Sequence, residues 1–252
     1  MTRVLSKSKF GLARSFTITL GICAIAWAFF SVPDFLAETP FSVTALRILS
    51  GDSFNARQLN SLALELETTP DQRLRSLALD DVAVVRLQLL LSKFDSGEPV
   101  ATSDLADLLT SVTDALGGTP TASFLWLMDF WLRGLSGMPV DTRSKLLSMS
   151  YATGPNEGWI AVRRNSLALG SFVPLPIELR KAALSEFARL VRSGFYRDAA
   201  NILAGPGWAV RDQLLSQLVE INEAGRRSFA AALASRDIDL KIPSMDGPSS
   251  QK

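Results

Sequence analysis

Histidine is absent from this chain of 252 residues, and cysteine occurs once, as Cys23. Without histidine the chain can form neither a Ser-His-Asp or Cys-His catalytic site nor a histidine-ligated metal centre. A single cysteine excludes a disulfide framework and a cysteine-ligated zinc site. An excess of one charge is also lacking, because 26 basic residues stand against 25 acidic ones. The composition therefore gives no electrostatic reason to expect a nucleic-acid partner.

Catalytic sequence motifs are lacking as well. The chain contains no GxSxG, HExxH, Walker A or GxGxxG pattern, so the nucleophiles, metals and phosphate groups that these motifs position have no recognisable site. We therefore expect a non-catalytic protein without a cofactor or metal. One enzymatic alternative stays open, a carboxylate-dependent glycan-processing enzyme of the lytic or glycosidase-like type. Such an enzyme would need two carboxyl groups on facing walls of a groove.

An uncharged apolar run lies near the start of the chain. Residues 15–33 read SFTITLGICAIAWAFFSVP and, as a helix, would span about 28 Å, close to the thickness of the hydrocarbon core of a bilayer. Residues 1–14 hold four basic residues and no acid, whereas all 25 acidic residues follow residue 33. By the positive-inside rule this asymmetry predicts a single-pass signal-anchor, with a cytoplasmic N-terminus and the bulk of the chain across the membrane.

Other interpretations of this run are less favoured. A cleaved signal peptide has the same basic and apolar regions, but this run is longer than a typical h-region, and its small-x-small triplet at 24–26 lies inside it. Lipidation of Cys23 is disfavoured by the bulky Ile22 before it. A buried core helix fits an uncharged run with a purely basic flank poorly. A retained anchor is the favoured interpretation, and a cleaved signal peptide stays the main alternative.

The remainder of the chain has the composition and spacing of helices. Leucine and alanine dominate, apolar residues recur three or four apart, and no β-branched alternation persists for five residues. Glycine and proline separate the expected helices, with Gly205-Pro206-Gly207 as the sharpest break. After residue 100 the expected helices are 103–116, 119–133, 141–150, 156–171, 177–193, 196–203, 208–222 and 225–236.

Short helices joined by short breaks predict an all-α fold of antiparallel helix pairs. The segment GFYRDA, residues 194–199, resembles the core of a tetratricopeptide repeat (TPR). In that motif glycine makes the turn between helices, the aromatic residue packs on the preceding helix and alanine permits close approach. Residues 51–56 carry a fainter form of this pattern, but no strict period of about 34 residues links the two. The expected fold is a degenerate TPR-like α-solenoid, with an irregular helical bundle as the alternative.

A basic start, one anchor and a TPR-like helical array together resemble alphaproteobacterial membrane-anchored TPR-like proteins encoded among surface-polysaccharide genes. In such proteins a block like SFNARQLNSLA, residues 53–63 here, closes one repeat and opens the next, at a similar distance from the anchor. The resemblance extends over residues 42–94 and 177–220. It implies a periplasmic scaffold that is tethered to the inner membrane bilayer and binds envelope proteins, including those of exopolysaccharide assembly or export.

These expectations divide the chain into five parts. In order, they are a basic cytoplasmic segment (1–14), a transmembrane signal-anchor (15–33), a linker (34–41), a helical TPR-like domain (42–240) and a disordered tail (241–252).

The most distinctive polar stretch is YATGPNEGWIAVRRN, residues 151–165. Tryptophan and arginine dominate the hot spots of protein interfaces, and tryptophan with polar neighbours also forms sugar-stacking surfaces. The stretch therefore predicts an interaction surface that consists of Trp159, Arg163, Arg164 and Asn165. The alternative is a tryptophan that belongs to the core, with arginines that are solvated or paired with acids.

Overall fold

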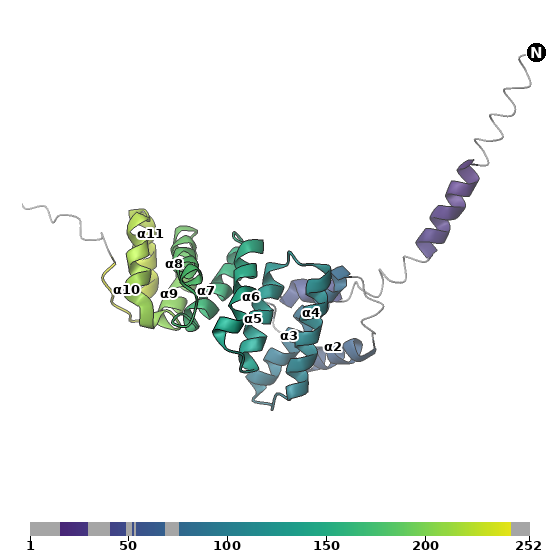
Figure 1. The fold of residues 1–252 in the computed structure, drawn as a ribbon, viewed down its shortest axis with the longest axis horizontal. Coiled ribbons are helices and arrows are strands. Elements are labelled where there is room, and N and C mark those ends of the chain that lie inside the picture. The colour runs from purple at the N-terminus through teal and green to yellow at the C-terminus, as the bar shows by residue number, and fades with distance from the viewer. Residues whose placement is uncertain (1–15, 30–40, 49–51, 53, 69–75, 243–252) are drawn as a thin grey trace, which may run out of the picture. The chain divides into compact units, whose positions relative to one another are not determined.

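The computed structural model describes residues 16–29, 41–48, 52, 54–68 and 76–242 (Figure 1). Every regular element within these ranges is a helix, which confirms the all-α prediction. The finer prediction of a TPR-like solenoid is not confirmed by the helix content alone. The basic segment, residues 34–40 of the linker and residues 243–252 of the tail lie outside the described residues.

The N-terminal helix covers residues 16–29, so residues 15 and 30–33 of the predicted anchor lie outside the described residues. Over the ranges that the structure describes, we find no helix whose length and apolar character would together allow it to cross a membrane. Almost every side chain of helix 16–29 is exposed, including its large apolar ones.

The chain divides into two compact units, residues 1–118 and 119–252. The boundary coincides with the sequence Gly117-Gly118-Thr119-Pro120, where one helix ends and the signal for the next begins. The stretch 42–240, which the sequence treats as one helical domain, therefore holds residues of both units.

The first unit has a small core between its helices. It contains a helix at 41–48, α2 (Ala56–Thr68), α3 (Ser76–Ser96) and α4 (Thr102–Gly118), and α3 packs along α4. Phe41, the last residue of the predicted linker 34–41, already belongs to the helix at 41–48. Phe41 is fully buried against Leu62 of α2 and Val82 of α3.

The second unit is built from helices that pack on their neighbours in the chain. The α5 helix packs against α6, α7 against α8, and α9 against both α8 and α11. Their bounds are α5 Ser123–Leu135, α6 Val140–Thr153, α7 Gly158–Gly170, α8 Ile177–Arg192, α9 Tyr196–Ala204 and α11 Glu223–Ala234.

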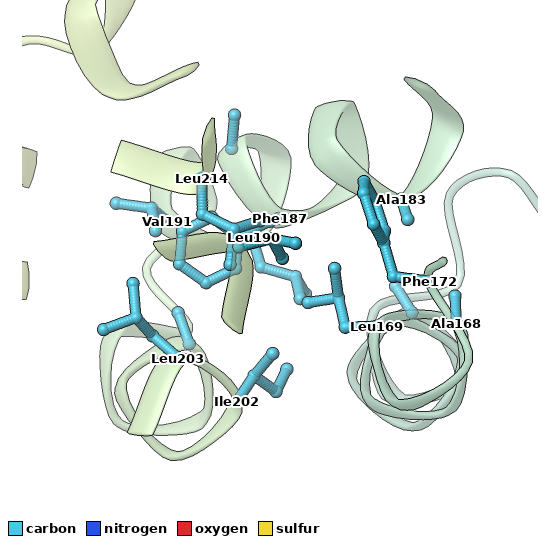
Figure 2. Packing of buried hydrophobic residues seen from close by; sticks show 14 of the residues in the cluster. Ala168, Leu169, Phe172, Ala183, Phe187, Leu190, Val191, Ile202, Leu203 and Leu214 are labelled. Carbon is cyan, nitrogen blue, oxygen red and sulfur yellow. The ribbon is translucent and has the colours of Figure 1, made fainter. Parts of the chain in front are cut away.

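One continuous core joins the helices of the second unit, from Leu127 of α5 to Leu233 of α11. Figure 2 shows its middle part, where Leu169 of α7, Phe187 of α8 and Leu203 of α9 lie in one cluster. Phe187 and Phe229 of α11 pack edge to face, with ring centroids 5.8 Å apart. This arrangement is favourable for aromatic pairs, because a positive ring edge meets a negative ring face.

The segment with the TPR-like pattern forms the turn between α8 and α9. Gly194 has a φ of +86°, a conformation that favours glycine. Phe195 packs against the core, and Ala199 is fully buried. The local roles that the pattern assigns to glycine and alanine, a turn and a close approach, are thus present at these positions.

The expected helix at 208–222 is wrong in detail. The chain there forms the 3₁₀ turn η2 (Trp208–Val210), the short α10 (Arg211–Ser216) and the 3₁₀ turn η3 (Gln217–Glu220). Leu214, Leu215 and Leu218 are all buried in the core of the second unit. The tighter 3₁₀ turns at both ends let the backbone follow this core instead of continuing as one straight helix.

Candidate functional site

The four residues of the predicted interaction surface lie on α7, but burial separates them into two pairs. Trp159 is half-buried and Arg163 is exposed, whereas Arg164 and Asn165 have no exposed surface. At about 100° per residue, positions 164 and 165 point away from the face that carries 159 and 163. The prediction of a surface role is therefore wrong for Arg164 and Asn165, and the structure leaves Trp159 and Arg163 as the accessible pair.

Trp159 and Arg163 form a small aromatic and cationic patch. The Arg163 guanidinium carbon lies 5.5 Å from the Trp159 ring centroid, and its Nη1 donates to the Trp159 carbonyl at 3.2 Å. The indole also meets the Phe124 ring of α5, with centroids 5.0 Å apart and planes tilted by 46°. The indole is thus half-buried between α5 and the core, while Arg163 is exposed to solvent. We call this pair the α7 patch.

Arg164 closes the C-terminal end of α6 from inside the core. Its Nη1 donates to the Ser150 carbonyl at 2.6 Å, and its Nη2 donates to the Gly154 carbonyl at 3.1 Å. These carbonyls lie at the end of a helix, where the helix dipole favours a positive charge, and the Ser150 carbonyl also accepts from the Gly154 N–H at 3.2 Å. A guanidinium supplies both the donors and the charge.

The charge of Arg164 is neutralised by Glu186 of α8. Nε and Nη2 of Arg164 donate to Oε1 of Glu186 at 3.0 and 2.5 Å, and both side chains are buried. Tyr151 donates its hydroxyl to Oε2 of the same carboxylate at 3.0 Å, and the Arg164 guanidinium carbon lies 4.3 Å from the centre of the Tyr151 ring. We call Arg164, Glu186, Tyr151 and Ser150 the buried network.

Burial dominates the titration of the buried network. It raises the pKa of the Glu186 carboxyl, and the hydrogen bonds from Arg164 and Tyr151 oppose this shift. Burial, followed by the nearby negative charge of Glu186, raises the pKa of the Tyr151 hydroxyl well above its usual value. Tyr151 therefore stays a neutral hydrogen-bond donor at physiological pH.

Small residues make room for the buried network. A Cβ atom on Gly154 would lie 2.4 Å from Cβ of Ser123, so that position accepts only glycine without a shift of α5. Ser123 uses the space to donate from Oγ to the Ser150 carbonyl at 2.8 Å. The neighbouring Asn165 donates from Nδ2 to the Ala183 carbonyl at 2.7 Å, which fastens α7 to α8. Together with Ser123, the buried network therefore links four helices, α5 to α8.

Buried carboxylates in this unit are engaged by arginines. Asp129 of α5 is buried and accepts from Nε of Arg133 at 2.6 Å, as Glu186 accepts from Arg164. Across the ranges that the structure describes, no three His, Cys, Asp or Glu side chains come together as metal ligands would. The buried network has a structural role, because its donors and acceptors face one another inside the core.

Glu186 is the residue that sequence reasoning missed. A signal for it does exist, since it falls among Leu179, Ala183, Phe187 and Leu190 on the buried face of α8. An acid at an inward position of an amphipathic helix needs a buried cationic partner. The sequence offers many arginines, however, and does not say which one it is.

Comparison of the chain with protein-family models, with curated proteins and with solved structures finds no match in any of the three. The resemblance to membrane-anchored TPR-like proteins consequently stays a prediction.

The buried network predicts a strong coupling between its two charges. We expect Arg164→Met and Glu186→Leu each to lower the free energy of unfolding by about 3–5 kcal/mol, because each leaves one buried charge without its partner. The double variant should lose clearly less than the sum, with a coupling of about 2 kcal/mol. Urea unfolding followed by circular dichroism measures all three values.

The matched control for this cycle is the exposed pair Lys181 and Glu178, whose charged groups are 3.4 Å apart on the same helix. The cycle of Lys181→Met and Glu178→Leu should give a coupling below about 0.5 kcal/mol. Equal couplings in the two cycles would contradict a structural role for the buried network.

Proposed function

We propose that the protein is a non-catalytic helical scaffold of the bacterial cell envelope. Its N-terminal helix tethers it to the inner membrane, the helices that follow residue 40 lie in the periplasm, and it takes part in the assembly or export of surface polysaccharide by binding envelope proteins. The single observation that carries the proposal is the exposure of helix 16–29, whose apolar side chains point in every direction.

The large apolar side chains of helix 16–29 are between 54% and 77% exposed. They are Phe16, Ile18, Leu20, Ile22, Ile25, Trp27 and Phe29. At a helical spacing these positions fall on two opposite sides of the helix, so a partner that covers only one face would leave several of them in water. A soluble protein rarely exposes so large an apolar surface. A bilayer surrounds a helix on all sides and accounts for the whole surface.

The length of the apolar run also supports a tether. The uncharged sequence continues beyond both ends of helix 16–29, over residues 15–33. If the whole run is helical, its length of about 28 Å matches the hydrocarbon core of a bilayer. The four basic residues within 1–14 favour a cytoplasmic N-terminus, which directs the helices that follow the apolar run to the periplasm.

A scaffold role is supported by the second unit. The buried network and the continuous core hold α5 to α8 in fixed positions, which suits a surface that presents the same shape to each partner. The α7 patch combines a half-buried tryptophan and an exposed arginine, the residue types most often found at interface hot spots. We assign the α7 patch as the contact for an envelope protein. The resemblance to proteins encoded among surface-polysaccharide genes supports a partner in polysaccharide assembly or export.

Charges in the apolar helix should release the protein from the membrane. We expect the wild-type chain to stay in the membrane fraction after alkaline carbonate extraction. The variant Ile22→Asp/Ile25→Asp should appear in the soluble fraction, since each aspartate at the centre of a span costs about 2.5–3.5 kcal/mol.

The control for the aspartate variant is Ile22→Val/Ile25→Val, which keeps the helix apolar and should fractionate as the wild type does. An aspartate variant that remains membrane-bound to the same extent as the valine control would refute the tether.

The α7 patch should lie against another protein in cells. A photocrosslinking residue, p-benzoylphenylalanine, in place of Arg163 should yield a discrete crosslinked species after irradiation, because its ring would replace the guanidinium at the contact. Immunoblotting of the full-length chain detects the shift in mass.

The matched control position for crosslinking is Arg227 of α11, which is also exposed and also pairs with a residue four positions earlier, Glu223 at 3.4 Å. We expect no discrete species from that position. The same products from both positions, or none from Arg163, would count against the α7 patch as a contact.

A further inference from the structure

We propose that the outer face of helix 41–48 lies on the periplasmic surface of the bilayer, with Val43 and Leu46 in contact with lipid. The inference rests on the proposed membrane tether and goes beyond it, because it assigns a second contact with the membrane to a folded part of the first unit. The occupant of this face is the lipid surface itself.

Helix 41–48 is apolar on two opposite faces. One face carries Phe41 and Ala45, which are 0% and 1% exposed and belong to the core of the first unit or its edge. The other carries Val43 and Leu46, which are 53% and 67% exposed. Around the helix axis, position 43 lies about 200° and position 46 about 140° from position 41. The exposed pair therefore cannot reach the core that the first pair fills.

The helix is fastened to the first unit in a way that keeps the outer face open. Ser42 donates from Oγ to Oδ2 of Asp81 on α3 at 2.7 Å. Arg47 donates from Nε to Oδ2 of Asp52 at 3.0 Å, and its guanidinium carbon lies 5.0 Å from the centre of the Phe54 ring. These contacts fix the rotation of the helix about its axis, and so fix the direction in which Val43 and Leu46 point.

Chain length brings this face to the membrane. If the span ends at residue 33, seven residues (34–40) separate it from Phe41, and eight Cα–Cα steps join the two. Even fully extended, they reach no further than about 28 Å. Helix 41–48 is consequently the folded element nearest to the bilayer in the chain. A tether this short keeps the effective concentration of the lipid surface high. A contact of two side chains therefore suffices to hold helix 41–48 on the bilayer.

The chemistry of the outer face suits the boundary between lipid headgroups and acyl chains. Interfacial helices place apolar side chains about 5–10 Å into this boundary and keep polar groups toward the headgroups. Val43 and Leu46 supply the apolar contact, and Thr44 and Arg47 lie beside them on the helix. A partner protein would need a matching apolar groove, whereas the bilayer is already within reach.

Quenching by brominated lipids tests this inference on the full-length chain. Cys23, the single cysteine, is replaced by serine, and one new cysteine is labelled with bimane in vesicles whose lipids carry bromine near the start of the acyl chains. We expect the label at Leu46→Cys to be quenched about threefold more than the label at Val173→Cys, because only the former would lie at the acyl boundary. Val173 is a matched control, as it is an exposed apolar side chain of the second unit.

The pattern along the helix adds a second readout. Val43→Cys should be quenched like Leu46→Cys, whereas Thr44→Cys, on the flank of the helix, should be quenched less. If the apolar bimane itself drew each labelled position into the lipid, all three positions would be quenched alike. This result would overturn the inference.

A reference label at Phe29→Cys separates the two proposals. Strong quenching at position 29 with no more quenching at Leu46→Cys than at Val173→Cys would overturn the lipid contact and leave the tether intact. No quenching at position 29 would overturn the tether and the inference together. Self-quenching of the bimane at position 46 without quenching by bromine would show that a second copy of the chain covers the face, which also overturns the inference.

Discussion

Arg164 carries a charge that it cannot lose inside the protein, and it has no exposed surface. Its guanidinium must be neutralised and hydrogen-bonded where it lies, because an unpaired buried charge would destabilise the fold strongly. Glu186 supplies the opposite charge, and the end of α6 supplies carbonyl acceptors. The packing of α6, α7 and α8 is thereby tied to one side chain, and Ser123 extends the connection to α5. The rigid presentation of the α7 patch depends on this arrangement.

In the N-terminal part of the chain, the feature that needs an explanation is the exposure of apolar side chains and not the burial of a charge. Helix 16–29 is apolar on all sides, and helix 41–48 is apolar on the face opposite its core contacts. In the proposed account the bilayer covers both features, the first as a surrounding medium and the second as a flat surface. In the second unit the α7 patch mixes an aromatic ring with a charge, which suits a protein partner better than lipid. The proposed scaffold thus uses separate surfaces for membrane and partner.

Helix positions could be predicted from the sequence because glycine and proline mark their ends. The expected helix 177–193 became α8 (Ile177–Arg192), and 196–203 became α9 (Tyr196–Ala204). Burial of Arg164 could not be predicted in the same way, since its partner lies 22 residues further along the chain on another helix. The break of the expected helix 208–222 has no glycine or proline inside it, and packing against the core decides its shape.

The central claim is that a retained N-terminal span holds the folded units in the periplasm, and paired reporter fusions test it most directly. One reporter, active only in an oxidising exterior compartment, and one, active only in the cytoplasm, are fused after Pro40 and at the C-terminus. The account predicts exterior activity at both positions and a full-length product in the membrane fraction. Cytoplasmic activity at either position, or release of a shortened soluble product, would contradict it.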